Sequence, residues 1–343
     1  MKQHLNTLFV LTQDSYLAKE GECIVVRVDH QTKAKIPANS LEGVVCFGQV
    51  GCSPQLMAHC AENGIALTYL TLYGRFLAAV QGPQAGNVLL RRTQYRWADD
   101  PARSAMLARW ILKGKLHNAR ISLRRAARET DSDAARGALT AAADGQVAAI
   151  TRLDRETNLD GLRGVEGDAA ATYWSAFNHL IGRNDAAFTF TSRNRRPPRD
   201  AVNCLLSFLY TICTHDLRGA LQGVGLDPYV GYLHRDRPGR ASLALDMMEE
   251  FRPFLVDRLA LSLINRRQVD ETGFQTLDGG GVVMDDETRK EVLAAWQKRK
   301  QDTITHPFLG ETVPIGLLFH LQALLLARHI RGDLDGYPAF LWS

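Results

Sequence analysis

The chain contains 343 residues and carries a formal net charge of +4, with 45% hydrophobic and 23% charged residues. At roughly 100–200 residues per domain, this length predicts about two domains with an ordinary globular core. The composition excludes a small scaffold that depends on disulfides or metals to fold, and the modest net charge by itself predicts no nucleic-acid partner.

The sequence gives no sign of export or of membrane insertion. Its six cysteines form no C-x-x-C pair, and several lie in apolar runs, as buried free thiols do. The N-terminal apolar run Leu8–Leu11 is too short for a signal peptide, and polar residues interrupt the apolar stretch Ile315–Ile330. We therefore predict a reduced, cytoplasmic location and no membrane partner.

Residues 1–84 are predicted to form a small β-sandwich with one helix. Short runs rich in β-branched and aromatic residues alternate there with Gly, Asp and Asn, as strands and turns do. Between the third and the fourth run, Ser53 can cap a helix, Pro54 suits its first turn, and Asn63-Gly64 ends it. The predicted strands are Thr7–Leu11, Cys23–Val28, Gly43–Phe47, Ala66–Leu70 and Phe76–Val80.

The remainder is predicted to be mainly helical. Turn chemistry in Gly82–Asn87 predicts a linker over residues 85–92, followed by a C-terminal catalytic domain over residues 93–343. The glycine-rich stretch Phe274–Asp285 is predicted to be a hairpin, because no Lys-Ser/Thr completes a phosphate loop. The fold class is thus α+β in two domains. Besides one helix around Ala108–Leu123, the predicted helices are Asp133–Arg155, Glu166–Ile181, Ala201–Leu217, Asp246–Asn265, Glu287–Asp302 and Ile315–Ile330.

Basic residues are concentrated between Arg91 and Arg128, where only Asp99 and Asp100 oppose them. Four of them have the same spacing as the apolar residues of one helix face, shifted by one residue. They are therefore expected to form a basic stripe beside that apolar face. Such a stripe attracts polyanions, with an affinity that falls as salt rises. The alternative is a solvated helix face that acids from elsewhere in the fold balance. The stripe consists of Arg109, Lys113, Arg120 and Arg124.

Glu166 is the first candidate for chemistry. Tyr173, Trp174 and Phe177 follow it at helical spacing, so its carboxylate is expected on or beside an apolar face. A carboxylate in such a place is costly unless a cation or hydrogen bonds compensate it. The alternative is an acid in the first turn of a helix, favoured by the helix dipole.

His234 lies in the turn-rich segment Gly231–Gly239, and loops at the ends of elements commonly hold functional side chains. Asp246 and Glu249 are three residues apart and share a face if the segment is helical, where they repel each other without a cation nearby. The alternatives are an ordinary surface or core histidine, and a capping pair with Asp246 as the cap.

Two carboxylates and one imidazole form a plausible site for a divalent ion with positions left open for water and phosphate oxygens. Mg²⁺ prefers oxygen ligands, whereas Mn²⁺ accepts an imidazole more readily. An ion held by Glu166, His234 and Glu249 would neutralise charge that builds up on a phosphoryl group and orient the attacking oxygen.

These segments resemble a known family, the CRISPR-associated integrase–endonuclease, which is the larger of the two universal CRISPR adaptation proteins. The resemblance covers essentially the whole chain, and the tail His306–Asp333 resembles its I-C subtype. It implies that Glu166, His234 and Glu249 are catalytic metal ligands for Mg²⁺ or Mn²⁺, with Asp246 as a possible further ligand. Many relatives carry Asp at the position of Glu249. The motifs that carry the resemblance surround Glu166 and span Arg195–Phe208, Gly231–His234 and Asp246–Pro253.

The resemblance further implies a homodimer that joins with the small partner adaptation protein in a heterohexamer. The 3′-hydroxyl ends of a captured double-stranded DNA fragment would attack the CRISPR repeat by transesterification, without a nucleotide cofactor. An accessory adaptation nuclease often accompanies this subtype. DNA phosphates would contact the basic stripe and four further arginines, which position DNA without reading its sequence. The four further arginines are Arg193, Arg195, Arg196 and Arg199.

Two alternatives stay open. The same site would also serve a metal-dependent nuclease that hydrolyses branched or single-stranded DNA, because only the nucleophile changes from a DNA hydroxyl to water. A helical DNA-binding scaffold, in which the acids merely cap helices, would need no metal and would have no catalytic activity.

Overall fold

The N-terminal region is a β-sandwich with one helix, α1 (Pro54–Glu62), as predicted. The computed structural model describes residues 6–74, 76–80, 82, 88–183 and 185–343. Two four-stranded sheets have the strand orders β1-β5-β7-β8 and β4-β3-β2-β6. Ser53 caps α1 by accepting from Leu56 N, and Pro54 is its first residue. The strands are β1 (Asn6–Val10), β2 (Ser15–Glu20), β3 (Cys23–Val28), β4 (Gln31–Pro37), β5 (Leu41–Phe47), β6 (Val50–Cys52), β7 (Ala66–Leu70) and β8 (Phe76–Val80).

Strand β5 shows how the sandwich is attached to the rest of the molecule. Its side chains alternate between the two faces of the sheet. Val44 and Cys46 belong to the core shared by the two sheets and α1, whereas Val45 and Phe47 belong to the core of the helical region. A strand that is buried on both faces needs a continuous apolar run, which explains the sequence of this strand.

The C-terminal region is mainly helical, which confirms the predicted fold class. The predicted hairpin is also present, with β9 (Phe274–Thr276) antiparallel to β10 (Val282–Met284), and a second small ladder joins β11 (Thr303–Thr305) to β12 (Thr312–Pro314). The helices are α2 (Val88–Ala98), α3 (Pro101–Glu129), α4 (Asp133–Leu153), α5 (Leu159–Ala176), α6 (Ala201–Gly223), α7 (Ser242–Phe251), α8 (Asp257–Asn265), α9 (Asp286–Gln301) and α10 (Ile315–Arg331).

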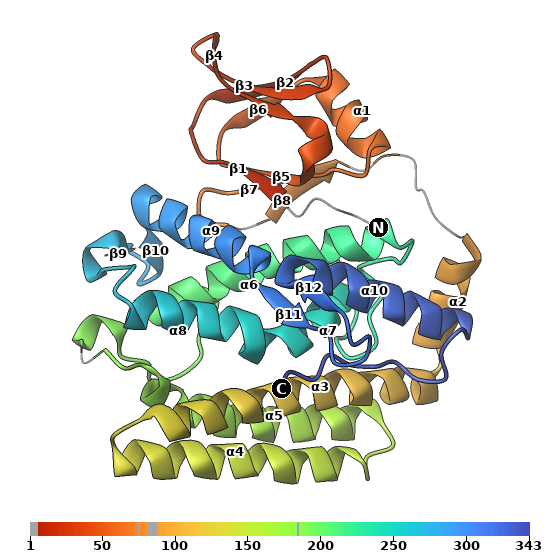
Figure 1. Cartoon of the computed structure of the whole chain (residues 1–343), viewed down its shortest axis with the longest axis vertical. Helices are drawn as coiled ribbons and strands as arrows, with labels where there is room; N and C mark the ends of the chain where they lie inside the picture. Colours follow the sequence, from red (N-terminus) through yellow and green to blue (C-terminus); the bar gives the residue numbers. More distant parts are fainter. Residues whose placement is uncertain (1–5, 75, 81, 83–87, 184) are drawn as a thin grey trace.

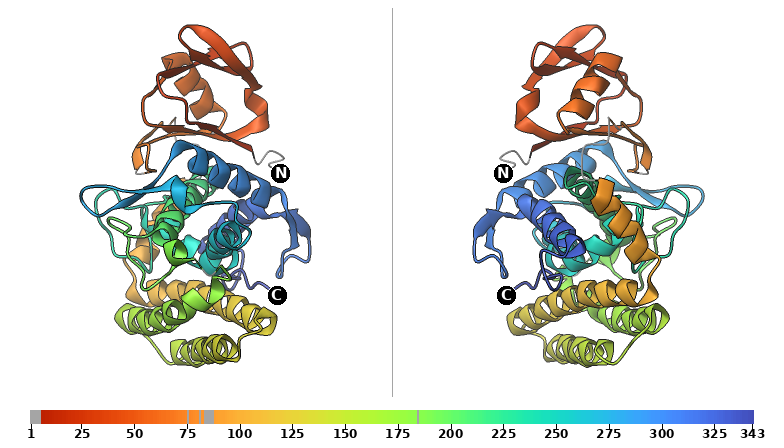
Figure 2. Two further views of the ribbon diagram at one scale, coloured as in Figure 1. Left: turned by 90° about the vertical axis from the view of Figure 1, so that its left-hand side faces the viewer. Right: turned by 90° about the vertical axis from the view of Figure 1, so that its right-hand side faces the viewer.

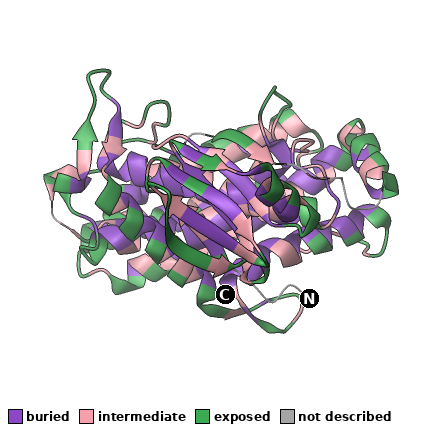
Figure 3. Ribbon diagram, turned by 90° about the horizontal axis from the view of Figure 1, so that it is seen from above, coloured by how far each residue is buried: buried purple, intermediate pink, exposed green. Residues whose placement is uncertain are grey.

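The elements form three tiers (Figure 1). The sandwich lies over a layer that contains α6, α9 and α10, and the long helices α3, α4 and α5 form the tier farthest from it. Both side views show the same arrangement (Figure 2). Buried residues are concentrated on the strands and on the inward faces of the helices, whereas turns are exposed (Figure 3).

Several predicted boundaries differ from the structure, and three of the differences change how an element is described. Helix α5 begins at Leu159, seven residues before Glu166, with Asn158 as its cap. The single helix predicted over Asp246–Asn265 is divided by one π-helical turn, Arg252–Val256, which includes Pro253. Within the predicted linker 85–92, residues 88–92 belong to α2, and residues 85–87 lie outside the described part.

Candidate metal centre and nucleic-acid interface

Asp246 organises the loop that carries His234. Helix α7 begins at Ser242 after Ala241, so Asp246 lies inside the helix and the capping-pair alternative is wrong. Its fully buried carboxylate accepts hydrogen bonds from the backbone N–H groups of Tyr232, Leu233 and His234 at 2.6, 3.0 and 2.9 Å. These bonds fix the backbone that precedes the histidine side chain.

The same carboxylate orients the imidazole. His234 Nδ1 lies 2.6 Å from Asp246 Oδ1, and a carboxylate that already receives three N–H groups accepts this one as well. The lone pair of His234 is therefore on Nε2, which lies 3.8 Å from Glu249 Oε1. Carboxylate, imidazole and an outward-facing Nε2 form the pattern in which a histidine binds a metal ion.

A close approach makes glycine necessary at the start of this loop. A Cβ atom added to Gly231 would lie 2.8 Å from Asp246 Oδ2 and 2.8 Å from the Cβ of Ser242. Any other residue at this position would push the loop away from α7 and break the bonds to Asp246.

Glu166 faces the same place from α5. It lies in the interior of this helix, so the alternative of an acid in a first helical turn is wrong. Its side chain is 28% exposed, whereas that of Glu249 is only 3% exposed. Glu166 thus lies on the side of the site that solvent reaches, and Glu249 lies on the buried side.

Lys115 of α3 links the two glutamates. Its ammonium forms an ion pair with Glu166 Oε1 and lies 2.8 Å from Glu249 Oε2. Burial lowers the pKa of Lys115, but Glu249 and Glu166 more than reverse this effect, so its pKa is raised and the amine is charged. The two carboxylates therefore converge on one cationic position.

Sequence reasoning did not single out Lys115, although a signal was present. It lies three residues after Leu112 and four before Ala119, both on the apolar face of α3. A lysine at such a position needs a carboxylate partner inside the protein.

Arg252 supports the buried side of the site. Its guanidinium lies 3.0 Å from Glu249 Oε1 and 5.0 Å from the ring centre of Tyr210. Burial would raise the pKa of Glu249, but Arg252, Lys115 and His234 together outweigh it, so the pKa is lowered and the carboxylate is ionised.

Carboxylate and imidazole groups are the ligand types that divalent cations such as Mn²⁺ accept. The buried Glu249 Oε2 lies 2.8 Å from the Lys115 ammonium, so this acceptor faces a positive charge. Among the described residues, no group of three or more His, Cys, Asp or Glu side chains is gathered closely enough to hold a metal ion by itself. The ammonium of Lys115 stands between Glu166 and Glu249, so this cation already bridges the two acids.

Two of the four residues in the basic stripe of α3 are neutralised by acids of the same chain. Lys113 pairs with Asp154, Arg124 pairs with Asp144 of α4, and Arg109 donates to the backbone carbonyl of Glu156. For Lys113 and Arg124 the structure supports the alternative of a helix face balanced by acids from elsewhere in the fold. Arg120 lies on the same face and is partly buried.

The arginines between α5 and α6 fall into two groups. Arg193 is held inside the fold, where it donates to Asn203 Oδ1 at 2.6 Å and to Ser207 Oγ at 3.1 Å. Arg195, Arg196 and Arg199 are exposed and form no ion pair with a carboxylate of the described residues. The free positive charge of this region therefore lies in the loop that precedes α6.

A β-sandwich on a helical body, with two glutamates, a histidine and a lysine from four different elements, defines a class of two-domain proteins with an acid–imidazole centre. The family described as CRISPR associated protein Cas1 matches residues 8–298. The chain belongs to this family.

Individual relatives agree with this assignment over their full length. A CRISPR-associated endonuclease Cas1 from Chlorobaculum tepidum is 54% identical over 346 residues, and one from Rhodospirillum rubrum is 51% identical over 347 residues, with 100% of each chain covered in both cases. The solved structure of a CAS1 protein from Thermotoga maritima has a similar fold, with a TM-score of 0.81 and 22% identity over 95% of this chain and 97% of that one.

No helix of the described residues is long and apolar enough to cross a membrane. All six cysteines are free thiols.

Proposed function

We propose that the chain is a metal-dependent DNA integrase and endonuclease of CRISPR adaptation. The observation that carries the proposal is the convergence of Glu166, Glu249 and His234, from three separate elements, around the position where Lys115 places a positive charge. The relatives are named endonucleases, which supports the nuclease class.

In this proposal Glu166, His234 and Glu249 hold a Mg²⁺ or Mn²⁺ ion. When bound, such an ion neutralises charge on the phosphoryl group under attack and orients the attacking oxygen. Asp246 acts through His234, because it holds the imidazole with Nε2 facing Glu249. Arg252 keeps the buried carboxylate of Glu249 in place.

The proposed reaction is strand joining. A 3′-hydroxyl of a captured DNA fragment attacks a phosphodiester of the CRISPR repeat, the new bond forms, and a repeat 3′-hydroxyl leaves. Hydrolysis at the same centre is the second candidate, since it only replaces the attacking hydroxyl by water. The relatives' name, endonuclease, supports cleavage of a phosphodiester, which both reactions include.

The proposed partners are the DNA fragment, the repeat DNA, a second copy of the chain and the small adaptation protein, in a heterohexamer. A solved Cas6-RT-Cas1–Cas2 complex contains a chain of similar fold. A Cas4/Cas1 fusion from Geobacter sulfurreducens, 34% identical to this chain, supports an accessory exonuclease as a further partner. Subtype I-C and the cytoplasmic location remain predictions.

Removal of the metal tests the centre. Chelation with EDTA should abolish strand joining, and Mn²⁺ should restore it at least as well as Mg²⁺. Glu166→Gln and His234→Ala should lose joining while they keep DNA affinity, measured by fluorescence anisotropy. Joining that persists in chelator, or in both variants, would refute the metal centre.

A fragment with blocked 3′ ends separates the two reactions. Integration needs a free hydroxyl on the fragment and should disappear, whereas hydrolysis of the same DNA should continue. Products are resolved on a denaturing gel, with the unblocked fragment as the matched control.

A further inference from the structure

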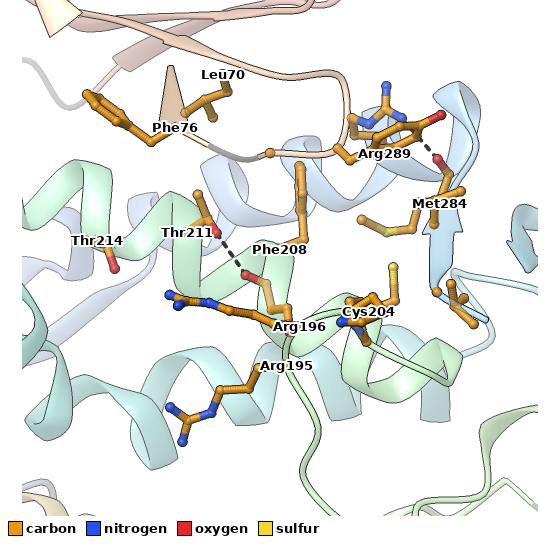
Figure 4. Close-up of a pocket in the computed structure, with 18 of the residues that line it drawn as sticks. Leu70, Phe76, Arg195, Arg196, Cys204, Phe208, Thr211, Thr214, Met284 and Arg289 are labelled. Carbon is orange, nitrogen blue, oxygen red and sulfur yellow. Dashed lines mark hydrogen bonds between the residues drawn. The ribbon is translucent and has the colours of Figure 1, made fainter. Parts of the chain in front are cut away.

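A cavity of about 570 Å³ lies between the β-sandwich and the helical region, separate from the acid–imidazole centre. Strands β7 and β8 form one side, helix α6 from Cys204 to Arg218 another, and the hairpin β9–β10 closes the end. Figure 4 shows Leu70 and Phe76 on the strand side, facing Thr211 and Thr214 of α6, with Arg196 at the other edge. This volume is within the range of sites for small organic ligands.

The charge of this cavity is one-sided. Four arginines line it, and no carboxylate is found among the described residues of the lining. Arg289 is the one of the four that is neutralised, by Asp286 at 2.8 Å. The four arginines are Arg195, Arg196, Arg218 and Arg289.

Arg218 is the most informative of these residues. It is only 8% exposed, forms no ion pair with a described carboxylate, and its Nε has no hydrogen-bond partner. Its guanidinium lies 4.5 Å from the ring centre of Phe76 and donates to Tyr229 Oη at 2.9 Å. Burial lowers the pKa of Arg218, because the charged guanidinium loses solvation. An anion in the cavity would compensate for this loss of solvation.

Besides the arginines, His215 and several hydroxyl side chains, the lining is apolar and aromatic. Phe76 is 39% exposed although it contacts a buried guanidinium, and Phe208 and Pro197 offer further flat surfaces. Aromatic rings beside arginines form the surface on which unpaired bases stack while phosphates are neutralised.

We propose that this cavity binds a nucleotide unit, with its base against Phe76 and Phe208 and its phosphate at Arg218 and Arg196. The nucleotide comes either from an unpaired end of bound DNA or from free mononucleotide. The site is distinct from the proposed metal centre, but its cationic edge is the loop Arg195–Pro198 that precedes α6.

The experiment measures binding of three probes by the full chain: dAMP, a blunt DNA duplex, and the same duplex with an unpaired 3′ overhang that carries 2-aminopurine. Phe76→Ala should weaken binding of the overhang duplex or of dAMP about tenfold. The matched control is Leu77→Ala, because Leu77 is also exposed, neighbours Phe76 on β8, and does not line the cavity.

The three probes identify the source of the nucleotide. Loss of dAMP binding in Phe76→Ala assigns a free-nucleotide site. A change confined to the overhang duplex, with reduced 2-aminopurine quenching, assigns a site for a DNA end. Arg218→Lys should keep partial binding of the affected probe, and Arg218→Gln should lose it, which separates the charge from the packing of this side chain.

Equal affinities of the Phe76→Ala and Leu77→Ala proteins for all three probes would overturn the proposal. Glu166→Gln provides the separation from the proposed metal centre, because this variant should keep nucleotide binding. If the proposed metal centre is wrong, the nucleotide-binding result still stands. If the proposed nucleotide site is wrong, the result of the EDTA experiment still stands.

Discussion

At the scale of single residues, Lys115 is the cation that joins Glu166 and Glu249. A buried ammonium between two glutamates stabilises both carboxylates, but it stands where a divalent cation bound to the same carboxylates would also be attracted. Lysine and metal ion therefore compete for the same negative charge, and the flexible stem of the lysine allows its ammonium to move away when the ion binds.

Lys115→Met tests this competition. Without metal, the variant should be less stable by about 3–5 kcal/mol, since the buried Glu249 loses a partner. Its affinity for Mn²⁺ should nevertheless rise roughly 10–100-fold, because a like charge near the ion is removed. Urea unfolding in EDTA and isothermal titration with Mn²⁺ provide the two measurements.

The test is specific because the Lys115→Met substitution should lower the stability of the protein but raise its affinity for Mn²⁺. If Lys115 had only a structural role, the Lys115→Met substitution would lower both the stability of the protein and its affinity for Mn²⁺. Lys113→Met is the matched control, since Lys113 pairs with Asp154 away from Glu166 and Glu249 and should change neither quantity by much.

The sequence predicted the members of this centre better than their connections. Glu166, His234 and Glu249 were identified from their motifs, and the structure places Glu166 and Glu249 on one lysine and His234 Nε2 3.8 Å from Glu249 Oε1. The role of Asp246 as the acceptor for a whole loop was not predictable from spacing, because its partners are backbone groups 12 to 14 residues away. Local patterns do not reveal contacts between distant segments.

At the scale of elements, strands of the sandwich that contain a run of apolar residues were predicted, whereas β2, β4 and β6 were missed, β2 although Leu17 and Ala18 are buried. β3, β7 and β8 have the predicted bounds. β4, with the sequence Gln-Thr-Lys-Ala-Lys-Ile-Pro, is an almost fully exposed edge strand, and β6 has only three residues. Polar edge strands carry little hydrophobic pattern, since their lysines keep the edge from pairing with other chains.

Asp257 joins three helices. At the start of α8, its buried carboxylate accepts from Tyr173 of α5 at 3.0 Å and from Tyr210 of α6. Burial raises the pKa of Asp257 to about 6, and the two tyrosines, Arg252 and Arg193 offset only part of this effect. The folded protein therefore binds a proton there more tightly than the unfolded chain does.

The pH dependence follows from this direction. Because the pKa is raised in the folded state, the contribution of Asp257 is fully present below about pH 4 and is lost as the pH rises through about 6, by up to roughly 3 kcal/mol. Asp257→Asn should remove this part of the decline, so its unfolding free energy should change less between pH 4 and pH 7. Urea unfolding at several pH values gives the comparison.

Other buried acids also titrate in this range, so only the difference between the two proteins is informative. Glu250, whose pKa burial raises to about 7, remains in both. Asp278→Asn, in an exposed turn, controls for the loss of a carboxylate as such and should reproduce the parent curve. A curve for Asp257→Asn parallel to that of the parent would show that the buried acid is ionised throughout.

At the scale of the whole molecule, the distribution of neutralised charge matters more than the net charge of +4. The basic residues of α3 were predicted to face DNA, yet Lys113 and Arg124 pair with acids that lie near or on α4. The sequence could not show this balance, because it depends on how two helices pack. Arg195, Arg196 and Arg199, in the loop that precedes α6, are exposed and pair with no carboxylate of the described residues, and two of them line the cavity beneath the β-sandwich.

This distribution predicts which arginines hold DNA. Each phosphate contact contributes about 0.9 to the slope of log affinity against log salt for duplex DNA. The double variant Arg195→Ala and Arg196→Ala should therefore weaken binding of a duplex fragment and reduce that slope by about 2. The double variant Lys113→Ala and Arg124→Ala removes the same charge from residues that already have partners, so it should change the slope much less. Fluorescence anisotropy over a salt series measures both, and an unchanged slope in the first variant would assign DNA binding to another surface.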